Sequence, residues 1–278
     1  MNQERREQIA AALRQYREMV LQHNLFLLRI LVEKVEAQPA PLNCPESVAQ
    51  ELRMQAINEL IEVPESIKLP RDVLDECVIS LLISSASLEG VDDDPVGPSL
   101  RREYFANPKA KIEERGVEVA EFPPADLEHL CTLVSGITGP GLPFHREASQ
   151  FNFITPLRRR KMKDMMEAVC VPEWEIAIAL KIGGGPRGWG GSYALYCKSG
   201  DKEQWKWRYG VYDEEGYSDV YENVEGFLGF YAHFNEQTEE ELEDDITSLS
   251  AHNKLSAKRY KLFTPAARDK YSILIPSM

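Results

Sequence analysis

The sequence predicts an α+β fold, in which a helical N-terminal region packs on a C-terminal domain with a mostly antiparallel sheet and flanking helices. In the first third of the chain, apolar residues recur three, four or seven positions apart, which is the spacing of one helix face. Aromatic residues gather later, since 14 of the 25 lie between Trp174 and Phe234, and aromatic side chains favour strands. We therefore expect a helical region at 1–90, a linker or loop at 91–110 and an α+β domain at 111–278.

Three helices are expected in the N-terminal region. The first ends before Pro39, because the residue that precedes a proline disfavours helical backbone. Its apolar face is expected to consist of Ile9, Leu13, Tyr16, Val20, Leu27 and Leu31. The second helix is expected at about 46–62. The third begins near Pro70, since proline suits a first helical turn.

Turn signals, helical spacing and enrichment in aromatic and β-branched residues predict the remaining elements. The segment 90–98 is rich in Asp, Gly and Pro, and Asn107-Pro108 is a further turn signal. Beyond them, the sequence predicts a short helix at 126–134, a basic helix at 156–169, strands at 174–182, 192–198 and 205–212, helices at 224–234 and 238–253, and a last strand at 271–275.

The composition is that of an ordinary globular protein with an excess of acids. The chain has 278 residues, of which 43% are hydrophobic and 28% charged, and its net charge is -13. Nucleic acids and anionic membranes attract positively charged surfaces, so we expect neither as a partner. The N-terminus is polar, and the five cysteines are scattered without a C-x-x-C pair. These features favour free thiols in a reducing cytosol, and therefore a cytoplasmic protein.

A glycine cluster follows the first expected strand of the C-terminal domain. Gly183, Gly185 and Gly188 satisfy the spacing G-x-G-x-x-G. A dinucleotide site requires a helix after this loop, whereas the residues that follow predict another strand. The motifs that accompany the glycine loop of a protein kinase do not occur. We therefore expect a flexible hairpin connection and no cofactor.

No motif supports a catalytic or metal site. The chain has no G-x-S-x-G element and no H-E-x-x-H pair. Cys131 lies two residues after His129, a spacing that places the two on different faces of a helix. We therefore assign no catalytic residue and no metal ligand, and the sequence leans towards a protein without catalytic activity.

Two runs of like charge lie in the C-terminal domain. Residues 158–163 hold five bases and no acid, whereas residues 236–245 hold seven acids and no base. Such runs are usually solvated helix faces. The alternative is that they attract a partner, or each other across the fold. The basic run also fits a nuclear import signal, so a nuclear location is the alternative to the cytoplasm.

Five short motifs between residues 122 and 234 resemble a known family. They are Pro123-Pro124-Ala125-Asp126-Leu127, Trp174-Glu175-Ile176-Ala177-Ile178-Ala179, Ser192-Tyr193-Ala194-Leu195-Tyr196, Tyr209-Gly210-Val211-Tyr212-Asp213 and the helix that runs from Val220 to Leu228. Together they resemble the SUKH superfamily, which contains fungal cell-wall-synthesis regulators and bacterial toxin-immunity proteins. The resemblance covers under half of the chain. It implies a non-catalytic α+β module that binds other proteins and needs no cofactor.

The leading hypothesis is therefore a non-catalytic intracellular protein-interaction or regulatory module whose partner is another protein. Its contact residues are expected around the glycine loop, at Arg187 and Trp189, and on the third strand, at Trp205 and Trp207. Trp205 and Trp207 are two positions apart on a strand, so they face the same side of the sheet. Such a row belongs more often to a core, and it becomes a candidate for binding where that face is exposed.

The alternative hypothesis is an enzyme, or an accessory protein of a biosynthetic pathway, with a pocket between the helical region and the sheet. Its pocket residues would be His145, Tyr193, Arg208 and Tyr209. A deep cavity with converging polar groups would favour the enzyme. A shallow surface with exposed tryptophan would favour the binding module.

Overall fold

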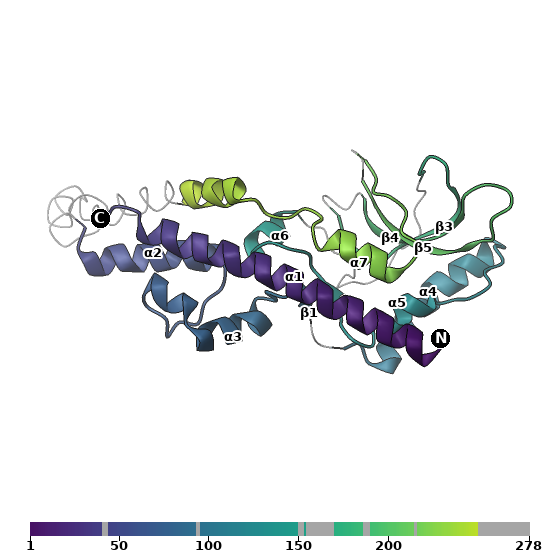
Figure 1. The fold of residues 1–278 in the computed structure, drawn as a ribbon, viewed down its shortest axis with the longest axis horizontal. Coiled ribbons are helices and arrows are strands. Elements are labelled where there is room, and N and C mark those ends of the chain that lie inside the picture. Colours follow the sequence, from purple (N-terminus) through teal and green to yellow (C-terminus); the bar gives the residue numbers. More distant parts are fainter. Residues whose placement is uncertain are drawn as a thin grey trace, which may run out of the picture. The chain divides into compact units, whose positions relative to one another are not determined.

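The α+β fold that the sequence predicts is confirmed. The computed structural model describes residues 1–40, 44–92, 95–149, 153, 170–185, 190–213 and 216–249, and Figure 1 shows their arrangement. The chain divides into two compact units. The first consists of Met1–Leu25 and Leu81–Glu236, and the second of Phe26–Ser80 and Gln237–Met278. The units thus have other boundaries than the three regions that the sequence predicts.

The helix α1 (Gln3–Glu36) contributes residues to both units. It ends before Pro39, as expected, and each apolar residue predicted for its buried face is at most 5% exposed. The spacing of these residues is therefore a sufficient signal for this element. Asn24 and Tyr16 also lie on the buried side of α1, where polar atoms need hydrogen-bond partners.

The second unit is helical in its described part. Besides the end of α1, it contains α2 (Glu46–Leu60), the 3-10 helix η1 (Pro70–Leu74), the first half of α3 (Glu76–Ser85) and a helix at 239–249. Thr238 and Glu241 cap this last helix reciprocally. The Thr238 hydroxyl accepts a hydrogen bond from the Glu241 N–H at 3.2 Å, and the Glu241 carboxylate accepts one from the Thr238 N–H at 2.8 Å.

The first unit contains the sheet. The strands β3 (Glu175–Lys181), β4 (Gly191–Lys198) and β5 (Lys206–Tyr212) pair antiparallel in the order β3-β4-β5. Each matches its predicted strand to within one residue at each end. A second, short pair joins β1 (Val91–Asp92) to β2 (Gly136–Ile137).

The expected linker at 91–110 is corrected by the structure, because β1 and most of the helix α4 (Pro98–Glu114) lie there. Asn107-Pro108 predicted a turn, but Pro108 lies inside the helix. A proline inside a helix removes one backbone hydrogen bond. Tyr104, Phe105 and Ile112 are buried on either side of it, and such tertiary packing provides most of the stability of a helix.

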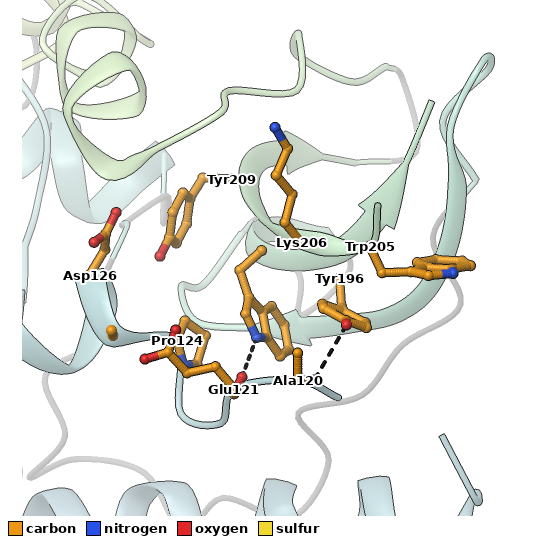
Figure 2. A pocket seen from close by; sticks show the side chains of 10 residues that line it. Ala120, Glu121, Pro124, Asp126, Tyr196, Trp205, Lys206 and Tyr209 are labelled. Carbon is orange, nitrogen blue, oxygen red and sulfur yellow. Dashed lines mark hydrogen bonds between the residues drawn. The ribbon is translucent and has the colours of Figure 1, made fainter. Parts of the chain in front are cut away.

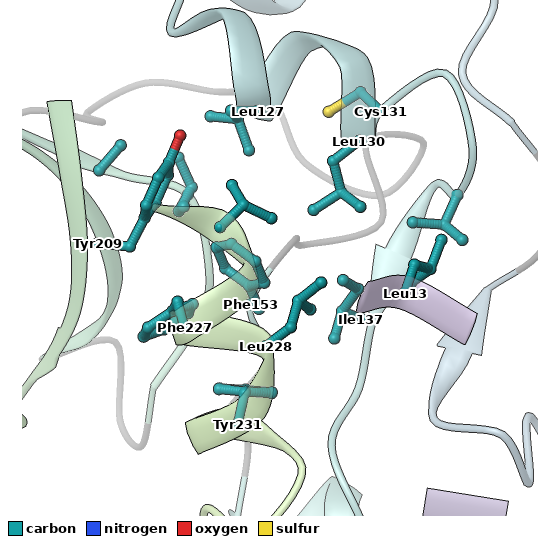
Figure 3. Packing of buried hydrophobic residues seen from close by; sticks show 14 of the residues in the cluster. Leu13, Leu127, Leu130, Cys131, Ile137, Phe153, Tyr209, Phe227, Leu228 and Tyr231 are labelled. Atoms are coloured by element: carbon teal, nitrogen blue, oxygen red, sulfur yellow. The ribbon is translucent and has the colours of Figure 1, made fainter. Parts of the chain in front are cut away.

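The main core of the first unit lies between the sheet and its helices. Phe153, Phe227, Leu228 and Tyr231 meet at its centre, as Figure 3 shows. Phe227 and its neighbours belong to α7 (Val224–Tyr231), whose first turn is capped by Asn223, since the Asn223 side chain accepts a hydrogen bond from the Gly226 N–H at 2.9 Å. The helices α5 (Ala125–Leu130) and α6 (Pro143–Ser149) complete the unit.

Some predictions fall on residues that the structure does not describe. The basic helix expected at 156–169 and the strand expected at 271–275 lie outside the described ranges. Of the helices within those ranges, none combines the length and the apolar character that a membrane span requires.

Candidate functional site

One face of the three-stranded sheet, together with the segment that precedes α5, forms a groove of about 250 Å³. Figure 2 shows its lining at close range. The lining residues are Ala120, Glu121, Pro124, Ala125, Asp126, Tyr196, Trp205, Lys206, Trp207 and Tyr209. We refer to this site as the aromatic groove. It contains both tryptophans that the sequence predicted for a contact surface on the third strand.

Three rings form one side of the groove, and we call Tyr196, Trp205 and Trp207 the aromatic wall. Tyr196 on β4 is the cross-strand partner of Trp207 on β5, so their side chains share a face of the sheet. The ring of Tyr196 stacks on Trp205 with 5.8 Å between the ring centroids and lies 5.2 Å from Trp207. Tyr196 is buried, whereas both tryptophans are half-buried. The wall is thus a rigid aromatic surface that is partly open to solvent.

The segment between α4 and α5 fixes the rings of the aromatic wall. The Trp207 indole Nε1–H donates a hydrogen bond to the Glu121 carbonyl at 2.7 Å, and the Ala120 N–H donates one to the Tyr196 hydroxyl at 3.4 Å. Phe122 packs on Trp207, with ring centroids 6.0 Å apart. These contacts hold residues 120–122 along the sheet and place the Glu121 carboxylate at the edge of the groove.

Carboxylates form the other side of the groove, and we call Glu121 and Asp126 the acidic wall. In Figure 2, Asp126 lies across the groove from Tyr196 and Trp205. Asp126 and Glu225 share the single guanidinium of Arg5, whose Nε donates to Asp126 Oδ1 at 3.2 Å and whose Nη2 donates to Glu225 Oε2 at 2.7 Å. The hydrogen bond with Asp126 raises the pKa of Arg5 above its ordinary value. Two carboxylates around one guanidinium leave one negative charge in excess.

The charge of Glu121 adds to this excess. Its side chain is exposed, and no cation among the described residues pairs with its carboxylate. The one cation of the lining, Lys206, is neutralised elsewhere, because its Nζ lies 2.5 Å from Glu222 Oε2 and 3.6 Å from Glu203 Oε1. The groove therefore has a negative potential beside its aromatic wall.

Tyr209 lies at the end of the groove near Asp126, as Figure 2 shows. The residue is 1% exposed, and burial raises the pKa of its hydroxyl well above the ordinary value. The hydroxyl therefore stays protonated at neutral pH and can donate a hydrogen bond.

Arg208 lies on the opposite face of the sheet, where it is fully buried. Its Nε donates to Glu222 at 2.7 Å and its Nη1 donates to the Cys197 carbonyl at 2.8 Å. Its Nη2 donates to Glu203, and the guanidinium lies 4.5 Å from the centroid of the Trp174 ring. With two carboxylates, a carbonyl and a ring around it, Arg208 serves to hold the turn after β4 against the sheet.

The Arg208–Glu203 pair predicts a loss of stability in acid. The Ser199 N–H, at 2.5 Å, and the Arg208 guanidinium lower the pKa of Glu203 to about 2. In the unfolded chain the pKa is about 4.3, so protons favour the unfolded state below that value. The stabilisation is complete above about pH 4.5 and is lost as the pH falls towards about 2.

Urea unfolding of the wild type and of Glu203→Gln across this range tests the prediction. We expect the variant to lose less stability than the wild type between about pH 4.5 and pH 2.5, because it has no carboxylate to protonate there. Asp201→Asn, at an exposed acid of the same turn, is the control and should follow the wild type. Equal slopes for Glu203→Gln and the wild type would contradict the assignment.

The four residues of the alternative pocket lie at different places. Only Tyr209 lines the aromatic groove. Tyr193 is fully buried on the same face of the sheet as Arg208, opposite to Tyr209, because consecutive strand residues alternate between faces. His145 is on α6, where its Nε2 lies 3.1 Å from the Asn235 carbonyl oxygen.

The two residues predicted for the glycine loop, Arg187 and Trp189, lie outside the described residues. Sequence reasoning missed Tyr196 and the acidic wall. Tyr196 could have been found from strand pairing, because a hairpin that joins 192–198 to 205–212 brings it beside Trp207. Nothing in the sequence placed Glu121 beside the sheet. Within the described ranges, no group of three or more His, Cys, Asp or Glu side chains is arranged to hold a metal ion.

Comparison with known proteins identifies no relative of this chain. No family model matches the chain, and no curated protein and no solved structure matches it. The resemblance to the SUKH superfamily therefore stays a prediction from the sequence, and the functional argument depends on the aromatic groove.

Proposed function

We propose that the chain is a non-catalytic intracellular protein-interaction or regulatory module that binds a protein partner through the aromatic groove. The observation that carries the proposal is the aromatic wall, in which two half-buried tryptophans are held in place by Tyr196 and by the Glu121 carbonyl. Rigid, partly exposed Trp and Tyr side chains are the residues that contribute most to protein interfaces, since they offer a large apolar area at a low entropic cost.

The size of the groove also favours a protein partner. Its volume of about 250 Å³ is below the roughly 300–1,000 Å³ of most small-molecule sites, and the groove is open to solvent. Such a site accommodates one or two side chains of a partner rather than an enclosed substrate.

The chemistry of the lining favours binding over catalysis. Among the described residues that line the groove, none is a Ser, Cys or His that could act as a nucleophile or a base near neutral pH. The Asp126 carboxylate is held by Arg5, and the Tyr209 hydroxyl stays protonated. The resemblance to SUKH proteins implies the same class of function, a module that binds other proteins.

Trp205→Ala tests the proposal. The wild-type chain is used to capture its partner from a cell extract, and the affinity of the purified partner is then measured for each variant by calorimetry. We expect Trp205→Ala to weaken binding about thirtyfold, as the loss of a hot-spot tryptophan does. Tyr217→Ala is the matched control, because Tyr217 is an aromatic residue of the same unit that is 52% exposed and does not line the groove.

The two variants separate a groove-dependent partner from other contacts. A partner that binds Tyr217→Ala as well as the wild type, but is lost with Trp205→Ala, supports the proposal. A partner whose affinity is the same for all three chains binds elsewhere, and this result would remove the aromatic groove as the interaction site.

A further inference from the structure

We infer that the aromatic groove recognises an arginine side chain of the partner, with the guanidinium placed between the aromatic wall and the acidic wall. The inference rests on the proposed function and names the chemical group that the groove selects. Three features carry it: the unbalanced carboxylates, the half-buried tryptophan rings opposite them, and a site elsewhere in the unit where a tryptophan and two carboxylates already bind an arginine.

The charges of the groove call for a cation. Asp126 shares Arg5 with Glu225, so their group has one negative charge in excess, and the exposed Glu121 adds another. Lys206 compensates for neither of them, because it is paired with Glu222. A ligand cation in the groove would therefore meet carboxylates whose charge the described residues leave unbalanced.

The rings opposite these carboxylates are suited to a flat cation. A guanidinium over the face of Trp or Tyr is attracted by the negative potential of the ring, and Arg is found in this position more often than Lys. A cation of the same chain already lies beside the wall, since the Lys198 Nζ, which pairs with Glu175 at 2.8 Å, is 5.1 Å from the centroid of the Trp205 ring. Trp207 turns its indole N–H to the Glu121 carbonyl, so its orientation is fixed before a ligand binds.

Arg208 shows that this combination of groups holds a guanidinium. On the other face of the sheet, Arg208 lies 4.5 Å above the Trp174 ring and donates to Glu203 and Glu222. Its Nη1 donates to the Cys197 carbonyl as well, so one tryptophan, two carboxylates and one carbonyl surround this buried guanidinium. The aromatic groove also presents a tryptophan and two carboxylates, namely Trp207, Glu121 and Asp126. None of the described residues that line it is an arginine.

Arginine is favoured over lysine because of its shape. The planar guanidinium offers donors along its edge to carboxylates while its face stacks on a ring, whereas an ammonium is a compact, strongly hydrated charge. The two walls of the groove present rings on one side and carboxylates on the other, so a side chain that uses its face and its edge together fits both.

A titration with N-acetylarginine N-methylamide tests the inference on the full chain. The readout is the indole N–H signals in a nitrogen-15 NMR spectrum, each of the four tryptophans being assigned by single substitution. We expect saturable shifts at Trp205 and Trp207, while Trp174, on the opposite face, keeps its position. The corresponding citrulline amide, a neutral analogue of the same shape, should bind at least about tenfold more weakly.

Glu121→Gln supplies the test of the acidic wall. Its side chain is exposed, so the fold is retained, and we expect about threefold weaker binding of the arginine amide. The matched control is Glu118→Gln, which removes an exposed acid from the same segment but not from the lining, and should bind as the wild type does.

The outcomes separate this inference from the proposed function. Equal binding of the arginine and citrulline amides, or no shift of Trp205 and Trp207, refutes recognition of arginine, even if the protein partner is still lost with Trp205→Ala. Selective binding of the arginine amide by a chain whose partner ignores Trp205→Ala supports the arginine site and refutes the groove as the partner interface.

Discussion

Replacing Phe227 by alanine is expected to lower the free energy of unfolding by about 3–5 kcal/mol. Phe227 is fully buried in the middle of α7. Its ring centroid lies 4.5 Å from that of Phe153, 5.6 Å from Tyr231 and 6.2 Å from Tyr209. The substitution removes a whole ring from this cluster and leaves a cavity that the surrounding rings fill only in part.

The measurement is urea unfolding followed by tryptophan fluorescence. All four tryptophans belong to the first unit, so the signal reports the unfolding of the unit that contains Phe227. Phe230→Ala is the matched control: it makes the same chemical change in the same helix at a half-buried position, and should cost clearly less. If the two substitutions lower the free energy of unfolding by the same amount, the centre of the core does not lie at Phe227.

The substitution also tests how the core supports the aromatic groove. Phe227 packs on Tyr209, which lines the groove, and its helix carries Glu225, which binds Arg5 beside Asp126. A loss of packing at Phe227 therefore reaches both the end of the groove and the acidic wall. Weakened binding in this variant would follow from the fold and would not identify Phe227 as a contact residue.

The elements of the fold could be predicted where their apolar pattern is strong and local. The three strands follow from enrichment in aromatic and β-branched residues, and α1 follows from one unbroken helical face. α4 could not be predicted in the same way. Asn107-Pro108 is a strong local turn signal, and the burial of Tyr104 and Phe105 against distant residues stabilises the helix in spite of it. Tertiary packing of this kind leaves no local trace in the sequence.

In the candidate site, too, the local features could be predicted and the contacts between distant residues could not. The spacing of Trp205 and Trp207 on one strand predicts that they share a face, and the structure places them together in the groove. The acidic wall depends on contacts between distant parts of the chain, since Asp126 reaches Arg5 across 121 positions and Glu121 lies beside the sheet through its carbonyl bond to Trp207. Arg208, which the sequence offers as a pocket residue, is instead enclosed by its own carboxylates.

Two polar side chains of α1 also make contacts with distant parts of the chain that the sequence does not predict. Asn24 is fully buried. Its Nδ2 donates to the Leu88 carbonyl at 2.8 Å, and its Oδ1 accepts from the Gly141 N–H at 2.7 Å. Tyr16 lies two turns earlier, where its hydroxyl accepts from the Gly139 N–H at 3.1 Å. Both side chains satisfy backbone groups of the loops next to β1 and β2.

Asn24→Ala is expected to lower the free energy of unfolding by about 2–6 kcal/mol, because two buried backbone groups lose their partner at once and each unsatisfied group costs about 1–3 kcal/mol. Tyr16→Phe removes a hydroxyl that accepts from the Gly139 N–H and donates to the Gly90 carbonyl at 3.2 Å. Because that carbonyl keeps its hydrogen bond from the Thr138 N–H, we expect a smaller loss of about 1–3 kcal/mol. Gln22→Ala, at an exposed position of the same helix, is the control and should stay within about 0.5 kcal/mol of the wild type.

Amide hydrogen exchange shows whether the loss arises at these bonds. In Asn24→Ala the Gly141 N–H should exchange faster than in the wild type, and in Tyr16→Phe the Gly139 N–H should do so, because each loses the acceptor that protects it. A backbone amide elsewhere in the unit, such as that of Phe227, reports only global unfolding and separates the two effects. Unchanged stability together with unchanged exchange at Gly141 would mean that Asn24 does not stabilise this loop, and that the backbone pairing of β1 with β2 and their apolar contacts are sufficient to hold it.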